Sequence, residues 1–366
     1  MFNNNQDVSK FMIPGDPFVD NGLWAMTVMA DLDHPSKLQK TDVDRVIREL
    51  LDWFFSGELK KVLYMLYTNY PLFNPNPAYT KEKREKMTVA LLFELSNLVF
   101  DNASGFPCAV CGKKQAHLEI QKDPDKPGTL ELLPALRTYV PMLGSKTLIN
   151  FFPHGSTGLH YCASCLLACQ FLPIMVWPSK NLILAHSYDE EIMRAIADMQ
   201  VKAFRERKAI ESLSRATGGA TRTTNALFRV VENLVVKLEG DCESPNLTFY
   251  DFTNYGQGAN IEGIITFPNK AFIFYRSINR INGWQSWNVL LKRGFSKKAL
   301  EPKRKQTPEE AEEEAFRSKR NQIYDNLLHN RSIVGYFINH QKRKLYGSWE
   351  LLSLYLEIVR KFNAEN

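Results

Sequence analysis

The sequence lacks several features that would place it in a familiar class. It contains no run of about 18 apolar residues, so no segment is expected to cross a bilayer. Asn3-Asn4-Asn5 near the start lacks the basic-then-apolar order of a signal peptide. Neither a Gly-x-Ser-x-Gly motif nor a Walker phosphate loop is present, which argues against serine-hydrolase and P-loop chemistry. We therefore expect a globular, cytoplasmic protein with no membrane partner.

The excess of one charge sign is also small. The 366 residues include 46 Lys and Arg against 40 Asp and Glu, which gives a formal net charge of +6. This balance permits a polyanionic partner but does not require one, so the distribution of charge matters more than its total. With 44% hydrophobic residues, the chain can bury a large core, which we expect to be divided into two or three units.

Cysteine is scarce, yet four of the six cysteines form two Cys-x-x-Cys pairs. The two-residue gap lets both thiolates of a pair turn toward one ion, and Gly112 suits the tight backbone after the first pair. In a reducing compartment such paired motifs favour metal over disulfides. We predict one structural Zn²⁺, because a site filled by cysteines leaves no position for a catalytic water. The predicted ligands are Cys108, Cys111, Cys162 and Cys165.

Alternatives remain open for this stretch. The cysteines could be reduced core residues, or one redox pair beside a coincidental second pair. Cys169, His154 or His160 could replace one ligand, although we expect them to be neighbours of the site. We expect Cys242 to be an ordinary buried thiol. A bound metal would hold together the two ends of a long insertion. The apolar residues of the insertion alone are too few to offset the conformational entropy lost when it becomes ordered.

The pattern of apolar residues and chain breakers predicts an α+β fold. Its parts are a helical N-terminal part, a zinc-clamped insertion, a short β-sheet segment and C-terminal helices. The corresponding segments are 1–105, 106–172, 173–308 and 309–366. Three short strands are expected, at 247–253, 261–267 and 271–275.

Residues 292–305 form the strongest cationic run in the chain, with one acid among them. Such a run has too little apolar content to fold easily by itself. We therefore expect a loop or arm that binds phosphates, with a merely solvated linker as the alternative. The predicted phosphate-binding residues are Lys292, Arg293, Lys297, Lys298, Lys303, Arg304 and Lys305.

Two polar loops are further candidates for nucleic-acid contacts. The loop 214–225 mixes glycines, hydroxyls and arginines, which suit close approach to a phosphate, and a plain flexible linker is the alternative. The turn 254–260 offers amides that can hydrogen-bond to base edges. The candidate residues in these loops are Arg215, Arg222, Asn225, Asn254, Gln257 and Asn260.

Three features taken together resemble one known family. They are Gly15-Asp16-Pro17-Phe18-Val19-Asp20, the two cysteine pairs, and Phe252-Thr253-Asn254-Tyr255-Gly256-Gln257-Gly258. In this order they are similar to the Cys-x-x-Cys/Cys-x-x-Cys family of large subunits from type I-B CRISPR Cascade, an RNA-guided surveillance complex. The likeness spans most of residues 12–280. Because many family members continue into a helical bundle, we expect that bundle to be truncated here or encoded separately.

The resemblance implies a subunit without an enzymatic site. It would recognise a protospacer-adjacent motif in double-stranded target DNA and help to open the duplex. The implied partners are the crRNA and the backbone, guide-end and small subunits of Cascade. Such a role needs phosphate contacts for affinity and a few base-edge contacts for a short motif. We expect the lysines of 292–305 to set affinity, and Asn254 and Gln257 to set motif preference.

Two other classes remain as alternatives. An HNH-type nuclease also clamps its metal site with Cys-x-x-Cys pairs, and His117, Asn150 and His154 lie between the pairs. Against this class, His117 lacks an adjacent Asp or His, and the only Asp-His pair, Asp33-His34, lies outside the module. A structural zinc scaffold of another ribonucleoprotein is the second alternative.

Overall fold

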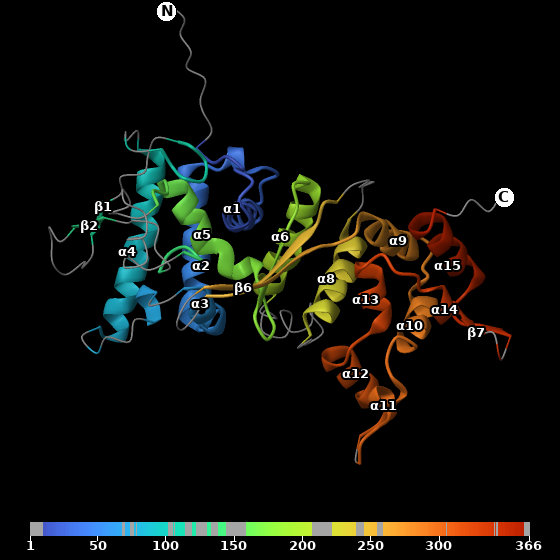
Figure 1. The fold of residues 1–366 in the computed structure, drawn as a ribbon. Coiled ribbons are helices and arrows are strands. Elements are labelled where there is room, and N and C mark those ends of the chain that lie inside the picture. Colours follow the sequence, from blue (N-terminus) through green and yellow to red (C-terminus); the bar gives the residue numbers. More distant parts are fainter. Residues whose placement is uncertain are drawn as a thin grey trace, which may run out of the picture. The chain divides into compact units, whose positions relative to one another are not determined.

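The structure is a computed structural model in which part of the chain is described. The described residues are 10–67, 70–73, 77, 79–101, 105, 107–113, 119–121, 130–132, 138–143, 159–206, 222–238, 245–254, 259–304, 306–339, 341 and 343–361. Over these residues the protein combines many helices with small sheets, which confirms the α+β prediction (Figure 1). No helix in this part of the chain has the length and apolar character needed to cross a membrane.

The contacts between residues divide the chain into two compact units. The first comprises Met1–Val176, Gln200–Arg207 and Phe252–Glu262. The second comprises Trp177–Met199, Lys208–Asp251 and Gly263–Asn366. Both cysteine pairs therefore belong to the first unit, and the whole cationic run belongs to the second.

The first unit is mainly helical (Figure 1). Its helices are α1 Pro17–Met29, η1 Pro35–Lys37, α2 Lys40–Ser56, α3 Lys60–Leu66, η2 Pro71–Phe73, α4 Lys81–Phe100 and α5 Ala163–Met175. The strands β1 Glu119–Gln121 and β2 Leu130–Leu132 pair antiparallel. Helix α6, Glu190–Arg205, contributes its last turns to this unit.

Helices α1 and α5 form the centre of the first unit, because α5 is buried on all sides and α1 is buried from Val19 onward. A helix that is apolar all round must lie inside a core. Gly22 allows the two helices to approach closely, since a Cβ atom there would lie 1.8 Å from the carbonyl oxygen of Ala168. Pro173 removes a backbone N–H from α5, and the Tyr67 hydroxyl donates instead to the Cys169 carbonyl. The core of this unit is therefore assembled around one tight helix pair.

The second unit contains a four-stranded sheet in the order β3-β4-β5-β6. The strands are β3 Trp177–Pro178, β4 Leu182–His186, β5 Thr248–Thr253 and β6 Asn260–Thr266, and β3 pairs antiparallel with β4. The last residues of β5 and the first residues of β6 belong to the first unit. A separate antiparallel hairpin joins β7 Ile338–Asn339 to β8 Lys344–Leu345.

Helices build the rest of the second unit. They are α8 Thr223–Lys237, α9 Asn269–Arg280, α10 Trp284–Lys292, α11 Lys297–Leu300, α12 Pro308–Ser318, α13 Gln322–Leu328, α14 Val334–Phe337, α15 Trp349–Leu354 and a π-helical turn, η4, at Tyr355–Val359. Their core is rich in aromatic rings: Phe228 stacks on Tyr324 with ring centroids 4.2 Å apart. Trp287 packs edge-on against Phe274 and Tyr275.

The prediction of a strand at 271–275 is wrong, because these residues lie in α9. Phe and Ile favour strands in isolation. The buried residues Ala271, Phe274, Tyr275 and Ile278 nevertheless follow the spacing of one helix face. Packing of that face against the aromatic core therefore overrides the local preference. Sequence reasoning also missed β4, a short strand that is buried throughout.

Candidate metal centre

The two cysteine pairs come together in the first unit and form one cluster. The sulfur atoms of Cys108, Cys111, Cys162 and Cys165 all lie within 4.8 Å of one another. The cysteines are free thiols, and all but the half-buried Cys111 are buried. The four residues are therefore positioned to bind a metal ion.

A tight turn presents the first pair. The Cys108 N–H donates to the Lys113 carbonyl at 2.7 Å, and the Gly112 N–H donates to the Cys108 carbonyl at 2.9 Å. Gly112 has φ +74°, in the left-handed region that glycine adopts without strain. The glycine expected after the first pair thus has the conformation that the turn requires.

The start of α5 presents the second pair. Cys162 precedes the helix and Cys165 lies in its first turn, where the Leu166 N–H donates to the Cys162 carbonyl at 3.0 Å. The Ala109 N–H donates to the His160 carbonyl at 2.7 Å and ties the two pairs together. Half of the ligand set therefore sits on the most buried helix of the first unit.

The four sulfurs strongly perturb one another. Hydrogen bonds from the other thiols lower the pKa of Cys108. The bond with Cys108 raises the pKa of Cys111, but the bonds with Cys162 and Cys165 outweigh it and lower the value to about 7. Hydrogen bonding to Cys108 and burial raise the pKa of Cys162 and Cys165. Without a cation, therefore, only some of the four thiols can lose their protons. Four thiolates at this distance from one another require a cation to balance their charge.

The proposed substitute ligands lie outside this cluster where the structure describes them. Cys169 is buried one helical turn beyond Cys165, and burial raises the pKa of its thiol. His160 takes part through its carbonyl, and the cluster of described residues includes neither its ring nor Cys169. His154 and Cys242 are not among the described residues.

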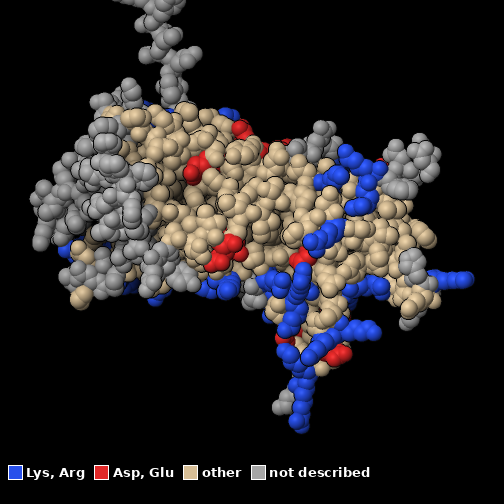
Figure 2. Space-filling model, viewed as in Figure 1, with Lys and Arg blue, Asp and Glu red and all other residues tan. Residues whose placement is uncertain are grey.

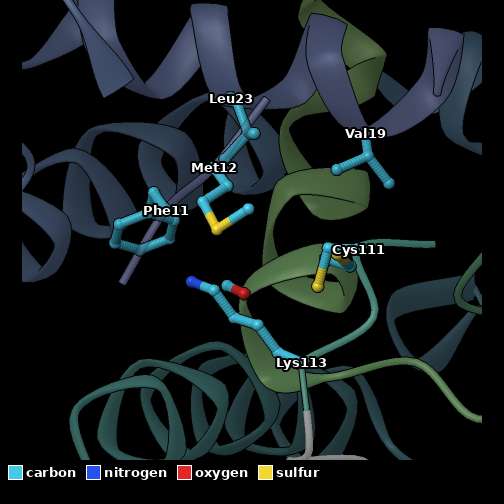
Figure 3. Close-up of a pocket in the computed structure, with 8 residues that line it drawn as sticks. Phe11, Met12, Val19, Leu23, Cys111 and Lys113 are labelled. Carbon is cyan, nitrogen blue, oxygen red and sulfur yellow. The ribbon is translucent and has the colours of Figure 1, made fainter. Parts of the chain in front are cut away.

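A narrow hollow lies beside the cluster (Figure 3). It is too narrow to hold a water molecule. Lys113 lies along it and donates from Nζ to the Lys10 carbonyl at 2.6 Å. Burial lowers the pKa of Lys113. The hollow is therefore a packing feature of the cluster wall, too tight for a substrate.

The Gly15–Asp20 segment caps α1. The Asp16 carboxylate accepts from the N–H groups of Phe18 at 3.0 Å and Val19 at 2.9 Å. The Gly15 N–H donates to the Asp20 carboxylate at 3.2 Å. These bonds satisfy donors that the first turn of a helix otherwise leaves unpaired. The motif therefore has a clear structural role at the start of the central helix.

The three features that carry the family resemblance meet in the first unit. The Phe18 ring packs edge-on against Phe252 of the third feature, with centroids 5.4 Å apart. Val19 lines the hollow beside Cys165. The buried Asn254 donates from its side-chain amide to the Leu66 carbonyl. Segments more than 200 residues apart in sequence thus form one structural neighbourhood.

The polar-loop candidates have different surroundings. Because Asn254 is bonded within the fold, a base-edge contact would have to replace that hydrogen bond. Asn225 is also buried and donates to the carbonyls of Phe316 at 2.8 Å and Lys319 at 2.9 Å. Asn260 is exposed and donates to Glu262 at 2.7 Å. Arg222 is half-buried before α8, whereas Arg215 and Gln257 are not described.

The cationic run is more ordered than the expected loop or arm. Lys292 ends α10 and pairs with Glu312 at 2.7 Å, and Lys303 pairs with Glu314 at 2.6 Å. The acidic helix α12 therefore neutralises part of the run, although exposed ion pairs of this kind add little stability. Figure 2 shows Lys and Arg side chains gathered over the region of α11 and α12. The exposed members are Lys297, Lys298, Lys303 and Arg304, and Lys305 is not described.

Most of the residues considered for an HNH nuclease fall outside the part of the chain that the structure describes. His117, Asn150 and His154 lie outside the described residues. In the Asp33-His34 pair, Asp33 forms an ion pair with Lys37 at 2.7 Å. His34 Nδ1 lies 2.7 Å from the Ser36 hydroxyl at the start of η1. The pair thus takes part in local helix capping.

The four-cysteine cluster and the meeting of the three features define the site. Comparisons with family models, with curated proteins and with solved structures return no significant match.

Proposed function

We propose that this protein is a non-enzymatic, zinc-stabilised subunit of an RNA-guided complex, equivalent to the large subunit of type I-B CRISPR Cascade. The observation that carries the proposal is the meeting of the three resembling features. The capped start of α1, the cysteine cluster and the 252–258 segment share one unit, with Phe18 against Phe252 at 5.4 Å. The features that carry the resemblance thus also lie together within one unit, which supports a common structural role.

Zinc is the metal that the donor set favours. Zn²⁺ in structural sites takes four tetrahedral ligands with a Zn–S distance of about 2.3 Å, which separates the sulfurs by about 3.8 Å. The Cys111 and Cys162 sulfurs lie 3.5 Å apart, and all four lie within 4.8 Å. The set is closed, so bound Zn²⁺ would supply folding free energy and would leave no position for a reactive water. This closure supports a scaffold over a metal-dependent hydrolase.

Contacts with nucleic acid are assigned to the second unit and to the polar turn. Lys297, Lys298 and Arg304 are exposed and can contact phosphates without breaking an ion pair that the structure describes. We assign motif recognition to the 254–260 turn, where Asn260 is the exposed amide among its described residues. The 214–225 loop remains the second candidate for that task.

The proposal is tested by purifying a tagged form of this chain from its native cells and sequencing the RNA bound to it. We expect short RNAs that share a repeat-derived end, together with copurifying backbone and guide-end proteins. The variant Cys108→Ser plus Cys162→Ser should lose both the RNA and the partners, because the first unit no longer folds.

Cys169→Ser is the matched control, since this buried thiol lies outside the metal cluster. It should retain the RNA and the partners. Recovery of no RNA, or of RNA without a common repeat end, would refute membership in an RNA-guided complex. Metal-dependent DNA cleavage by the isolated chain would instead support the HNH nuclease.

A further inference from the structure

Trp349 is an unusual surface residue. It is the first residue of α15 and its side chain is 70% exposed. Trp24, Trp177 and Trp287, by contrast, are almost completely buried. Most of the large aromatic surface of Trp349 therefore remains available to contact a ligand.

A cationic hairpin immediately precedes Trp349. Strands β7 and β8 pair Ile338 with Leu345, and the Tyr346 N–H donates to the Phe337 carbonyl at 2.8 Å. Arg343, directly before β8, and Lys344, its first residue, are both exposed. Arg343 has φ +45°, so the chain turns sharply there. The hairpin therefore holds two cations a few residues before the exposed ring.

A third cation joins this surface from α10. Arg293 lies over the Tyr346 ring, 3.6 Å from its centroid, and its Nε donates to the Tyr336 carbonyl at 2.8 Å. Lys344 Nζ lies 5.3 Å from the same centroid. Neither cation forms an ion pair with a described carboxylate. Two positive charges are thus held on one ring, an arrangement that an anionic ligand would relieve.

The charge of the chain is concentrated in this region. Residues 263–366 contain 19 Lys and Arg against 10 Asp and Glu, whereas the preceding residues contain 27 against 30. The whole excess of positive charge therefore lies in the C-terminal part. Glu350 directly follows Trp349 and is exposed, which reduces the local charge but leaves it positive. Such an asymmetry favours an anionic ligand over a neutral one, and the repeated charges of a nucleic-acid backbone match it.

We infer that the β7–β8 hairpin and Trp349 form a binding site for single-stranded nucleic acid. Arg343 and Lys344 contact phosphates, Arg293 adds positive charge, and Trp349 stacks on an unpaired base. A base face is accessible for stacking only outside a duplex, and exposed aromatics beside cations are the usual means of binding single strands. This inference depends on the nucleic-acid binding in the proposed function and names a contact for it.

The test is binding of the full-length protein to a labelled oligothymidylate, an oligouridylate and a DNA duplex, measured by fluorescence anisotropy at two salt concentrations. Trp349→Ala should weaken binding to a single strand about tenfold, and Trp349→Phe should retain most of it. Arg343→Asn plus Lys344→Gln should also weaken it, and should lower the salt slope by about 1.4 units for two lost phosphate contacts. Duplex binding should change less with Trp349→Ala. The DNA and RNA strands show which sugar the site prefers.

Matched controls separate this site from general effects. Tyr188→Ala removes another exposed ring of the second unit, which is 76% exposed, and Lys60→Gln plus Lys61→Gln removes two exposed cations of α3. Both should leave single-strand affinity within about twofold of the wild type. Unchanged affinity in Trp349→Ala, or equal losses in the controls, would overturn this inference alone. Failure of the wild type to bind any nucleic acid would overturn the proposed function as well.

Discussion

The two units of this protein are stabilised by different means. The first contains four cysteines positioned to bind a metal ion, and two helices in such close contact that Gly22 has no room for a side chain. The second depends on stacked aromatic rings and on a buried polar network, in which Glu232 accepts from Arg229 at 2.7 Å and from Tyr324 at 3.2 Å. A unit whose core is built around a cysteine cluster and one tight helix crossing should tolerate few substitutions there. A unit with a broad aromatic core can carry many exposed charges.

The difference suggests a division of labour. The first unit places its distinctive residues inside, where they set structure. The second unit carries the cationic run, the β7–β8 hairpin and the exposed Trp349 on its surface, where they can meet a ligand. Changes to the cysteine cluster or to core packing should therefore mainly lower the stability of the first unit. Changes to surface charge should mainly weaken ligand binding by the second unit.

Removal of the metal should have the largest effect. Cys108→Ser plus Cys162→Ser should destabilise the first unit by about 5 kcal/mol or more, since structural Zn²⁺ supplies about 10–16 kcal/mol in small domains. Elemental analysis and thermal unfolding followed by circular dichroism, before and after chelation, measure it. The aromatic circular dichroism of the second unit should outlast that of the first.

Cys169→Ser provides the comparison, and it should keep the metal. A wild-type protein without metal, or a double serine variant that melts at the wild-type temperature, would show that the cluster is an ordinary part of the core.

Gly22→Ala should have the next largest effect. Its Cβ would lie 1.8 Å from the Ala168 carbonyl oxygen, so α1 and α5 would have to separate at a cost of about 3 kcal/mol or more. Gly335→Ala in α14 is the matched change, because nothing lies within 4 Å of its Cβ position. That variant should be neutral, or more stable by up to about 1 kcal/mol. Chemical denaturation measures both, and equal changes would contradict the close helix contact.

The stability of the two units should change with pH in opposite directions. This is the smallest of the predicted effects. Burial raises the pKa of Glu232 above 4.5 despite its contact with Arg229. Its contribution to stability is fully present below the unfolded pKa and is lost as pH rises through the raised value. Glu232→Gln should remove this dependence of the unfolding free energy on pH. The stability lost in the wild type is about 1.4 kcal/mol for each unit by which the pKa is raised.

Asp44 in the first unit gives the opposite sign. Burial raises the pKa of its carboxyl, but hydrogen bonds with Lys40 and Ser96 outweigh this and lower it below 3.8. Its contribution is therefore present above the unfolded pKa and is lost as pH falls through the lowered value. Asp44→Asn should make the unfolding free energy fall less steeply at acid pH. This change should be smaller than the change in pH dependence caused by Glu232→Gln, because Asp44 is better solvated than Glu232. Unfolding free energies measured from pH 3 to pH 7 should give two slopes of opposite sign, and slopes of the same sign would contradict this assignment.

The sequence alone determined the short-range features. The Cys-x-x-Cys spacing brings two sulfurs of each pair to one side of a turn, and Gly112 has the predicted conformation because few other residues adopt it. The helix–sheet character followed from periodicity, because spacing along the chain decides which side chains share a face. The family resemblance also depended only on local motifs and their order.

Only the tertiary structure decided which residues are inside. It converted the strand-like 271–275 segment into part of α9, and it placed Asn225 and Asn254 in the core although both looked like surface amides. It left Trp349 exposed beside the hairpin and brought Phe18 to Phe252. The physical reason is that burial depends on which distant surfaces pack together, and local spacing carries little information about that packing.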